Sequence, residues 1–320
     1  MTSLLVESLA RSSRLILLTG CQLPGQQAWL SPPDPSINQN ILRRLHIEGT
    51  AVWFFQGHIF IEWKSSGCLL WIHGKRTPLS AFIGRAPSHS DVVSGLWEKR
   101  PLVCFSFLAS CGDLLFVSSS IIQDITVACE AGSAIMAYFY FDSWDLNKQT
   151  CHDLLRSLVS QLSTRSSPCV DILHHIYKTH ENGARQPSDD TLREYLKKML
   201  RLLGRGPIFI ILDALDECPE SPEISSPRSE VLHLVKELVD LHLQDLHICV
   251  TSRPEIDIRA VLEPLMSHSI SLHDESGQKT DIADYVRSVV NSSPSIAMTT
   301  WGVEDKNLVI GSLTERADGM

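Results

Sequence analysis

Short, continuously apolar runs alternate along the chain with longer segments whose apolar residues recur at helical spacing. The apolar runs are Cys68–Ile72, Ala134–Phe141, Ile208–Leu212, Ile248–Val250 and, more weakly, Ile270–Leu272. Strands that are apolar on both faces are typical of a parallel sheet covered by helices on both sides. The pattern therefore predicts an α/β fold with a parallel sheet of about five strands.

Helical spacing is clearest in two segments. Leu154, Leu155, Leu158, Val159 and Leu162 share one helical face, and Ser118–Ala128 carries Ile121, Ile122 and Ile125 behind serines that are suited to an N-cap. Further helices are expected at Asn38–Leu45, Val170–His180, Asp189–Leu203, Val231–Leu241, Thr280–Val290 and Asp305–Leu313.

Composition divides the chain into three parts. Residues 1–47 have the character of a leader and linker, because the proline-rich stretch Ser31–Ser36 cannot continue a helix or a central strand and is expected to be solvated. Residues 48–275 hold the alternating strands and helices of the core, and 276–320 begin a helical C-terminal extension that ends abruptly.

The strongest chemical signal follows the run Ile208–Leu212. Asp213 is the first polar residue at the carboxyl end of that predicted strand, where it could hold Mg²⁺ through water. Asp216 and Glu217 follow, where a carboxylate could orient an attacking water. The competing interpretation is an acidic loop that caps the next helix.

A second signal follows the run Ile248–Val250. Thr251 and Ser252 could donate hydrogen bonds at the strand's carboxyl end, and the guanidinium of Arg253 could reach a γ-phosphate. The alternative is a surface arginine before a proline turn. Because ligands bind outside the carboxyl ends of such strands, the acidic strand nearby favours a site.

The segments Asp213–Pro219 and Cys249–Pro254 closely resemble fungal NACHT proteins of the nephrocystin-3-like N-terminal type, a class of STAND P-loop NTPase. Flanking segments agree, among them Gly49–Phe54, Glu62–Lys64, Leu69–Lys75 and Ser119–Ile122, so the likeness spans roughly residues 38–320. It implies a P-loop NTPase-like sheet of ASCE type, with strands in the order 2-3-4-1-5. It also implies an ATP- or GTP-dependent signalling switch that uses Mg²⁺ and oligomerises, with Gly74 and Lys75 opening the phosphate loop.

The phosphate-binding loop departs from that family. A P-loop reads Gly-x-x-x-x-Gly-Lys-Ser/Thr. Counted from Gly74, Leu79 stands at the second glycine, Ser80 at the lysine and Ala81 at the hydroxyl that binds Mg²⁺. The likeness stops near Arg76 and resumes near Val117, so residues 76–116 form an atypical insertion without clear periodicity. We expect this insertion to be loosely packed.

Net charge, cysteine usage and the length of the apolar runs limit which binding partners and which cell compartment are expected. The net charge of −9 and the absence of a Lys/Arg run disfavour a nucleic-acid surface. Nine cysteines without a Cys-x-x-Cys pair suggest neither a disulfide scaffold nor a zinc site. No apolar run is long enough to cross a bilayer, so we expect a cytoplasmic protein without a membrane partner.

The sequence therefore predicts a nucleotide-binding STAND-type signalling module with impaired hydrolysis, whose partners are a nucleotide and either other proteins or further copies of itself. Two alternatives stay open. One is a pseudo-NTPase that acts only in protein interaction or oligomerisation. The other is a non-functional fragment from a faulty gene model, in which residues 76–116 are not genuine coding sequence.

Overall fold

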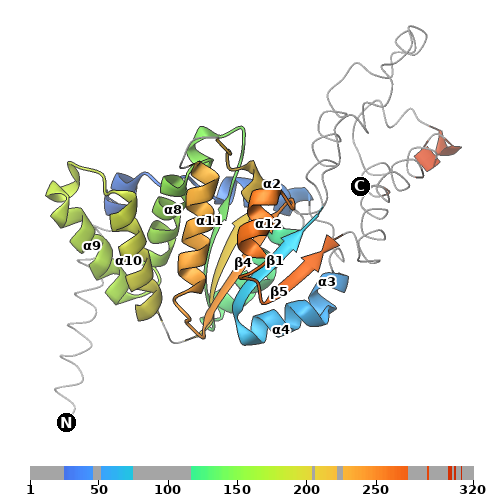
Figure 1. Cartoon of the computed structure of the whole chain (residues 1–320), viewed down its shortest axis with the longest axis horizontal. Helices are drawn as coiled ribbons and strands as arrows, with labels where there is room; N and C mark the ends of the chain where they lie inside the picture. The colour runs from blue at the N-terminus through green and yellow to red at the C-terminus, as the bar shows by residue number, and fades with distance from the viewer. Residues whose placement is uncertain are drawn as a thin grey trace, which may run out of the picture.

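A computed structural model describes residues 25–45, 52–74, 117–203, 206–221 and 226–272, with a few isolated residues beyond them. Five parallel strands form one sheet in the order β2-β3-β4-β1-β5 (Figure 1). They are β1 (Cys68–His73), β2 (Ile135–Tyr140), β3 (Ile208–Asp213), β4 (Leu246–Ser252) and β5 (His268–Ser271). The α/β class, the parallel sheet and the strand order expected from the sequence are confirmed.

Helices pack on both faces of the sheet (Figure 1). Those with defined bounds are α2 (Ser36–Leu45), α3 (Val52–Gln56), α4 (His58–Ser66), α8 (Cys151–Ser163), α9 (Ser167–Thr179), α10 (Asp189–Leu202), α11 (Pro227–Val239) and α12 (Ile256–Leu262). Residues 25–30 and 117–130 are also helical, and short 3-10 turns are η1 (Leu146–Lys148), η2 (Glu181–Gly183) and η3 (Leu215–Glu217).

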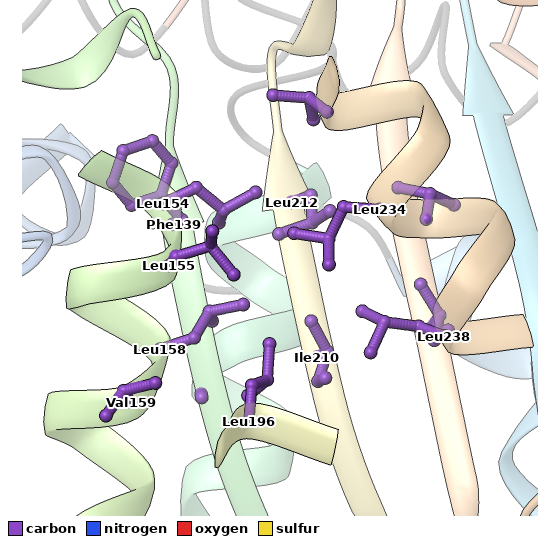
Figure 2. Close-up of a cluster of buried hydrophobic side chains, with 14 of the residues drawn as sticks. Phe139, Leu154, Leu155, Leu158, Val159, Leu196, Ile210, Leu212, Leu234 and Leu238 are labelled. Atoms are coloured by element: carbon purple, nitrogen blue, oxygen red, sulfur yellow. The ribbon is translucent and has the colours of Figure 1, made fainter. Parts of the chain in front are cut away.

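Alternate residues of each strand feed two separate cores. On one face, Ile210 and Leu212 of β3 pack with Leu158 of α8 and Leu234 of α11 (Figure 2). The opposite core is more aromatic and contains Trp63 of α4, whose ring lies 5.6 Å from that of Phe209. Since every residue of β3 is buried, the strand has no solvated face, as its continuous apolar run predicts.

Side-chain caps fix where several helices begin. Thr150, Ser166, Ser188 and Ser226 accept a hydrogen bond from a backbone N–H in the first turn of α8, α9, α10 and α11 respectively. From the sequence, the serines at 118–120 were expected to cap a helix. They do not, because the helix already includes residue 117. They lie buried within its described part instead.

The proline-rich stretch is solvated only in part: Ser31 and Asp34 are exposed, whereas Pro33 is not. Leu30, which precedes it, is fully buried and Pro33 is buried as well. Arg156 of α8 donates hydrogen bonds from Nη1 to the carbonyl oxygens of Leu30 (3.2 Å) and Ser31 (2.9 Å). The prolines agree with the predicted turn, and contact with Ser157 of α8 accompanies the burial of Pro33.

Several expectations lie outside the described residues. They concern Lys75, the insertion at 76–116 and most of the helices expected at 280–290 and 305–313. Within the part of the chain that the structure describes, no helix has the length and apolar character needed to cross a membrane.

Candidate functional site at the carboxyl edge of the sheet

Asp213 closes β3 and is fully buried. It lies in register with Tyr140 at the end of β2. From the other side, Thr251 of β4 donates a hydrogen bond from Oγ1 to Asp213 Oδ1 at 2.5 Å. The sheet thus brings three strand ends together around one carboxyl group.

Burial raises the pKa of Asp213 from 3.8 to about 7. Hydrogen bonds from Thr251 and Ser118 favour the charged form and partly oppose this shift, while the nearby charges of Glu217 and Asp216 add to it. Its second oxygen, Oδ2, has no hydrogen-bond partner in the described structure. A buried carboxylate with one bare oxygen lacks compensating positive charge, and a cation would supply it.

Mg²⁺ fits this oxygen only as part of a larger ligand set. Nowhere among the described residues do three His, Cys, Asp or Glu side chains gather closely enough to hold a metal by themselves. Proteins commonly hold Mg²⁺ through one or two carboxylates, with waters and substrate phosphates completing the shell. Asp213 Oδ2 therefore matches the protein's share of such a shell.

The chain turns sharply after β3. Ala214 adopts a left-handed conformation (φ 54°, ψ 46°), which is uncommon for a residue other than glycine. Its N–H donates to Thr251 Oγ1 at 3.0 Å, so the threonine hydroxyl both accepts from Ala214 and donates to Asp213. This turn leads directly into η3 and sets the direction of Asp216 and Glu217.

Asp216 and Arg253 pair with each other. The N–H of Arg253 donates to Asp216 Oδ1 at 3.0 Å, and Arg253 Nε lies 3.3 Å from Asp216 Oδ2. Arg228 of α11 holds the same turn by donating to the backbone oxygen of Asp216 at 2.7 Å. The two predicted residues therefore lie together at this edge, and Arg253 would have to leave Asp216 to reach a phosphate.

Glu217 faces the loop after β2. Its Oε2 accepts hydrogen bonds from Ser143 N at 3.0 Å and Ser143 Oγ at 3.3 Å. Burial raises the pKa of Glu217, the hydrogen bond from the Ser143 N–H opposes the shift, and the charges of Asp216 and Asp142 increase it. A carboxylate with a raised pKa suits general-base chemistry near neutral pH.

The remaining predicted residues lie at the ends of β1 and β4. Ser252 accepts a hydrogen bond from Trp71 Nε1 at 2.9 Å and is fully buried. Its register partner is His73, so Gly74, the next residue, leaves β1 beside the end of β4. Gly74 is buried, and Lys75 lies outside the described residues.

Three contributors to this edge were not anticipated from the sequence. Ser118 in the helix at 117–130 lowers the pKa of Asp213, Tyr140 is the register partner of Asp213 on β2, and Arg228 donates a hydrogen bond to the backbone oxygen of Asp216. The sequence indicated the serines at 118–120 as a possible cap and, through Ser119–Ile122, as part of the family resemblance, but not as neighbours of Asp213. No pattern signals Arg228, because its role depends on how α11 packs.

Residues 109–253 match the family of the nephrocystin 3 N-terminal domain. The matched stretch is less than half of the 320-residue chain, but it extends from just before the helix at 117–130 to Arg253. It contains all of β2, β3 and β4, and with them Asp213, Asp216 and Glu217. The match supports a nephrocystin-3-like N-terminal domain in this part of the chain. A search of curated proteins gave no match.

Proposed function

We propose that this chain is the nucleotide-binding module of a STAND-type signalling NTPase of the NACHT kind, and that its hydrolysis of ATP or GTP is impaired. The observation that carries the proposal is the buried carboxyl group of Asp213, held by Thr251 with one oxygen unpartnered, at the carboxyl edge of a sheet ordered β2-β3-β4-β1-β5. Ligands of open parallel sheets bind at that edge.

Each predicted residue has a part in this proposal. Asp213 would hold Mg²⁺ through a water molecule. The bound Mg²⁺ would neutralise negative charge on the phosphates. Glu217 and Asp216 would orient the attacking water, and Arg253 would contact the γ-phosphate after it leaves Asp216. The phosphates would be positioned by Gly74, Lys75 and Ser252. Thr251 would contribute indirectly, by orienting the carboxyl group of Asp213.

Impairment follows from the loop sequence. Leu79, Ser80 and Ala81 stand where a P-loop needs glycine, lysine and a hydroxyl, and these positions lie outside the described residues. Phosphoryl transfer depends mainly on positioning and charge neutralisation, so the missing lysine and glycine affect both. Arg253 cannot compensate freely because Asp216 already binds it.

The same departure favours a second function, a pseudo-NTPase that serves only as a protein-interaction or self-association module. The two proposals differ in nucleotide affinity. If the sequence at 76–116 proved not to be genuine coding sequence, the chain would instead be a non-functional fragment, and sequencing of the transcript between Lys75 and Ser118 decides this.

The test is calorimetric titration of the full chain with ATP and with GTP, with and without Mg²⁺. We expect measurable binding that strengthens with Mg²⁺, and loss of that Mg²⁺ dependence in Asp213→Asn. Asp240→Asn, at an exposed position after α11, is the matched control. No affinity for either nucleotide would reject the NTPase module and leave the interaction module.

A further inference from the structure

Arg228 is a buried cation at an electrostatically unfavourable position of α11. It is the second residue of that helix, after Pro227, and its exposed fraction is 8%. The N-terminus of a helix carries partial positive charge, so a buried cation there is costly unless other groups compensate it. The cap of α11 is supplied by Ser226, whose Oγ accepts from the N–H of Ser229 at 3.1 Å. The helix start therefore does not account for Arg228, and its side-chain contacts do.

The guanidinium of Arg228 binds the backbone of the turn after β3. Its Nε donates to the carbonyl oxygen of Cys218 at 2.9 Å, and its Nη2 donates to that of Asp216 at 2.7 Å. The backbone N–H of Arg228 also donates to the carbonyl oxygen of Pro219, at 3.2 Å. The planar guanidinium presents donors at a fixed spacing, which the compact ammonium of a lysine does not reproduce.

The third nitrogen of the guanidinium faces α12. Arg228 Nη1 lies 3.3 Å from Asp257 Oδ2 and 3.5 Å from Glu220 Oε2. The side chain of Glu220 is 61% exposed and that of Asp257 is 31% exposed, so water screens the contact with Glu220 more strongly. Asp257 is in the first turn of α12. Arg228 therefore joins the turn after β3 to the start of α12.

Two links consequently connect this turn with the chain that follows β4. In the first, Asp216 accepts from the N–H of Arg253 and pairs with its guanidinium. In the second, Arg228 joins the backbone of Asp216 to the carboxylate of Asp257. Between the two links, the N–H of Glu255 donates to the carbonyl oxygen of Arg253 at 2.9 Å. Both links meet at Asp216, so a change in the second acts on the first.

We infer that Arg228 is a positioning residue of the candidate site, which links the turn after β3 to α12 and thereby keeps Asp216 paired with Arg253. It acts through Asp216 and not on a nucleotide directly. The contact of Arg253 with a phosphate rests on the proposed function, whereas its pairing with Asp216 does not.

The test is amide hydrogen exchange, followed by NMR, of the full chain and of two variants. Arg228→Lys keeps the positive charge but loses the fixed spacing of the donors. Asp257→Asn weakens the link to α12 and leaves the donors to the turn in place. We expect exchange of the Arg253 amide to accelerate about tenfold or more in Arg228→Lys and about threefold or more in Asp257→Asn, because its bond to Asp216 loosens. The amide of Ile210 in β3 should keep its rate in both.

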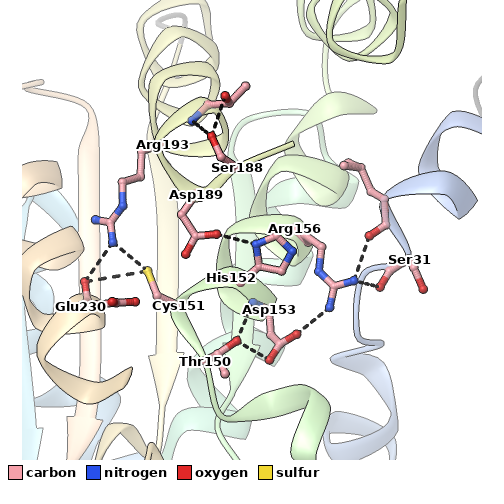
Figure 3. Close-up of polar contacts among 12 residues, drawn as sticks. Ser31, Thr150, Cys151, His152, Asp153, Arg156, Ser188, Asp189, Arg193 and Glu230 are labelled. Atoms are coloured by element: carbon pink, nitrogen blue, oxygen red, sulfur yellow. Dashed lines mark hydrogen bonds and ion pairs between the residues drawn. The ribbon is translucent and has the colours of Figure 1, made fainter. Parts of the chain in front are cut away.

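Arg193→Lys is the matched control. Arg193 is also a largely buried arginine, and its Nη2 donates to Cys151 Sγ at 3.2 Å and to the carbonyl oxygen of Glu230 at 3.4 Å (Figure 3). These contacts join α10 to α8 and α11, so the substitution should leave the Arg253 amide unchanged.

Three results would overturn the inference. One is an unchanged Arg253 amide in Arg228→Lys or in Asp257→Asn. Another is equal acceleration at Arg253 and Ile210, because a merely structural role would loosen the whole domain. The third is the same acceleration in Arg193→Lys. The measurement needs no nucleotide, so a chain that binds neither ATP nor GTP would reject the proposed function while the Arg253 amide still decides the role of Arg228.

Discussion

Some features of the polar residues at the carboxyl edge were predictable from the sequence, and others were not. The positions of Asp213 and Thr251 were predictable, because each is the first polar residue after an apolar run. The carboxyl ends of neighbouring parallel strands lie at the same edge of a sheet, so the two residues were expected to be close. The pairing of Arg253 with Asp216 was not predictable. It depends on the left-handed turn at Ala214, and an alanine gives no sequence signal for that conformation.

The raised pKa of Asp213 makes a pH-dependent prediction at this scale. Its folded pKa of about 7 exceeds its ordinary 3.8, so between these values the folded protein holds a proton that the unfolded chain has released. Stability therefore falls as pH rises from about 4 to 7, by up to about 4 kcal/mol, and stays lower above that window.

Asp213→Asn removes this titration while leaving the shape of the side chain unchanged. We expect the variant to be more stable than the unmodified chain by about 1–3 kcal/mol at pH 8, after the cost of an unpaired buried amide, and to lose that advantage by pH 4. Urea unfolding at both pH values measures this. Asp240→Asn is the exposed control. If the free energy of unfolding changed with pH in the same way in Asp213→Asn and in the unmodified chain, the raised pKa would not belong to Asp213.

At the scale of elements, apolar periodicity predicted strands and helices well. Four strands overlap continuous apolar runs and β5 overlaps the weaker signal at Ile270–Leu272, while α8 buries the face that carries Leu154, Leu155 and Leu158. The burial of Pro33 was not predicted, because the prolines of Ser31–Ser36 have the composition of a linker. The neighbouring contact between Leu30 and Arg156 spans more than a hundred residues of sequence, so no local pattern reveals it.

The α8 interface predicts a large effect from a core truncation. Leu158 is fully buried against the sheet (Figure 2), so Leu158→Ala removes apolar contacts and leaves a cavity. We expect a loss of about 2–5 kcal/mol in the free energy of unfolding, measured by chemical denaturation. Leu146→Ala, at a position that is 81% exposed, is the matched control and should change stability by less than about 0.5 kcal/mol. Equal effects of the two variants would contradict this packing.

At the scale of the whole molecule, the sheet order and the family match both support a candidate site at the carboxyl edge of the sheet. The order β2-β3-β4-β1-β5 places the ends of β1, β3 and β4 side by side, and the matched residues 109–253 supply β3 and its acidic turn. The family resemblance anticipated this order. Residues 76–116, between β1 and the helix at 117–130, lack the Gly-Lys-Ser/Thr of a P-loop pattern and lie outside the described residues.

Self-association belongs to the same scale and stays a proposal. Its basis is the resemblance to STAND proteins together with two exposed apolar side chains in the loop after β2. Trp144 and Leu146 stand 84% and 81% exposed there, next to the Ser143 that binds Glu217. Exposed aromatic and aliphatic groups on this loop would supply apolar surface to a protein contact.

Nucleotide turnover by the purified full chain, beside a version in which a loop with the P-loop pattern replaces Arg76–Phe116, tests the central claim most directly. The loop would supply the glycine, lysine and serine, and Asp213→Ala in each background is the control. We predict that the unmodified chain turns over ATP and GTP at least about a hundredfold more slowly than the repaired one, since losing one electrostatic contact alone costs on the order of 3 kcal/mol. Equal turnover that Asp213→Ala abolishes in both would contradict the account, because another phosphate site would then exist.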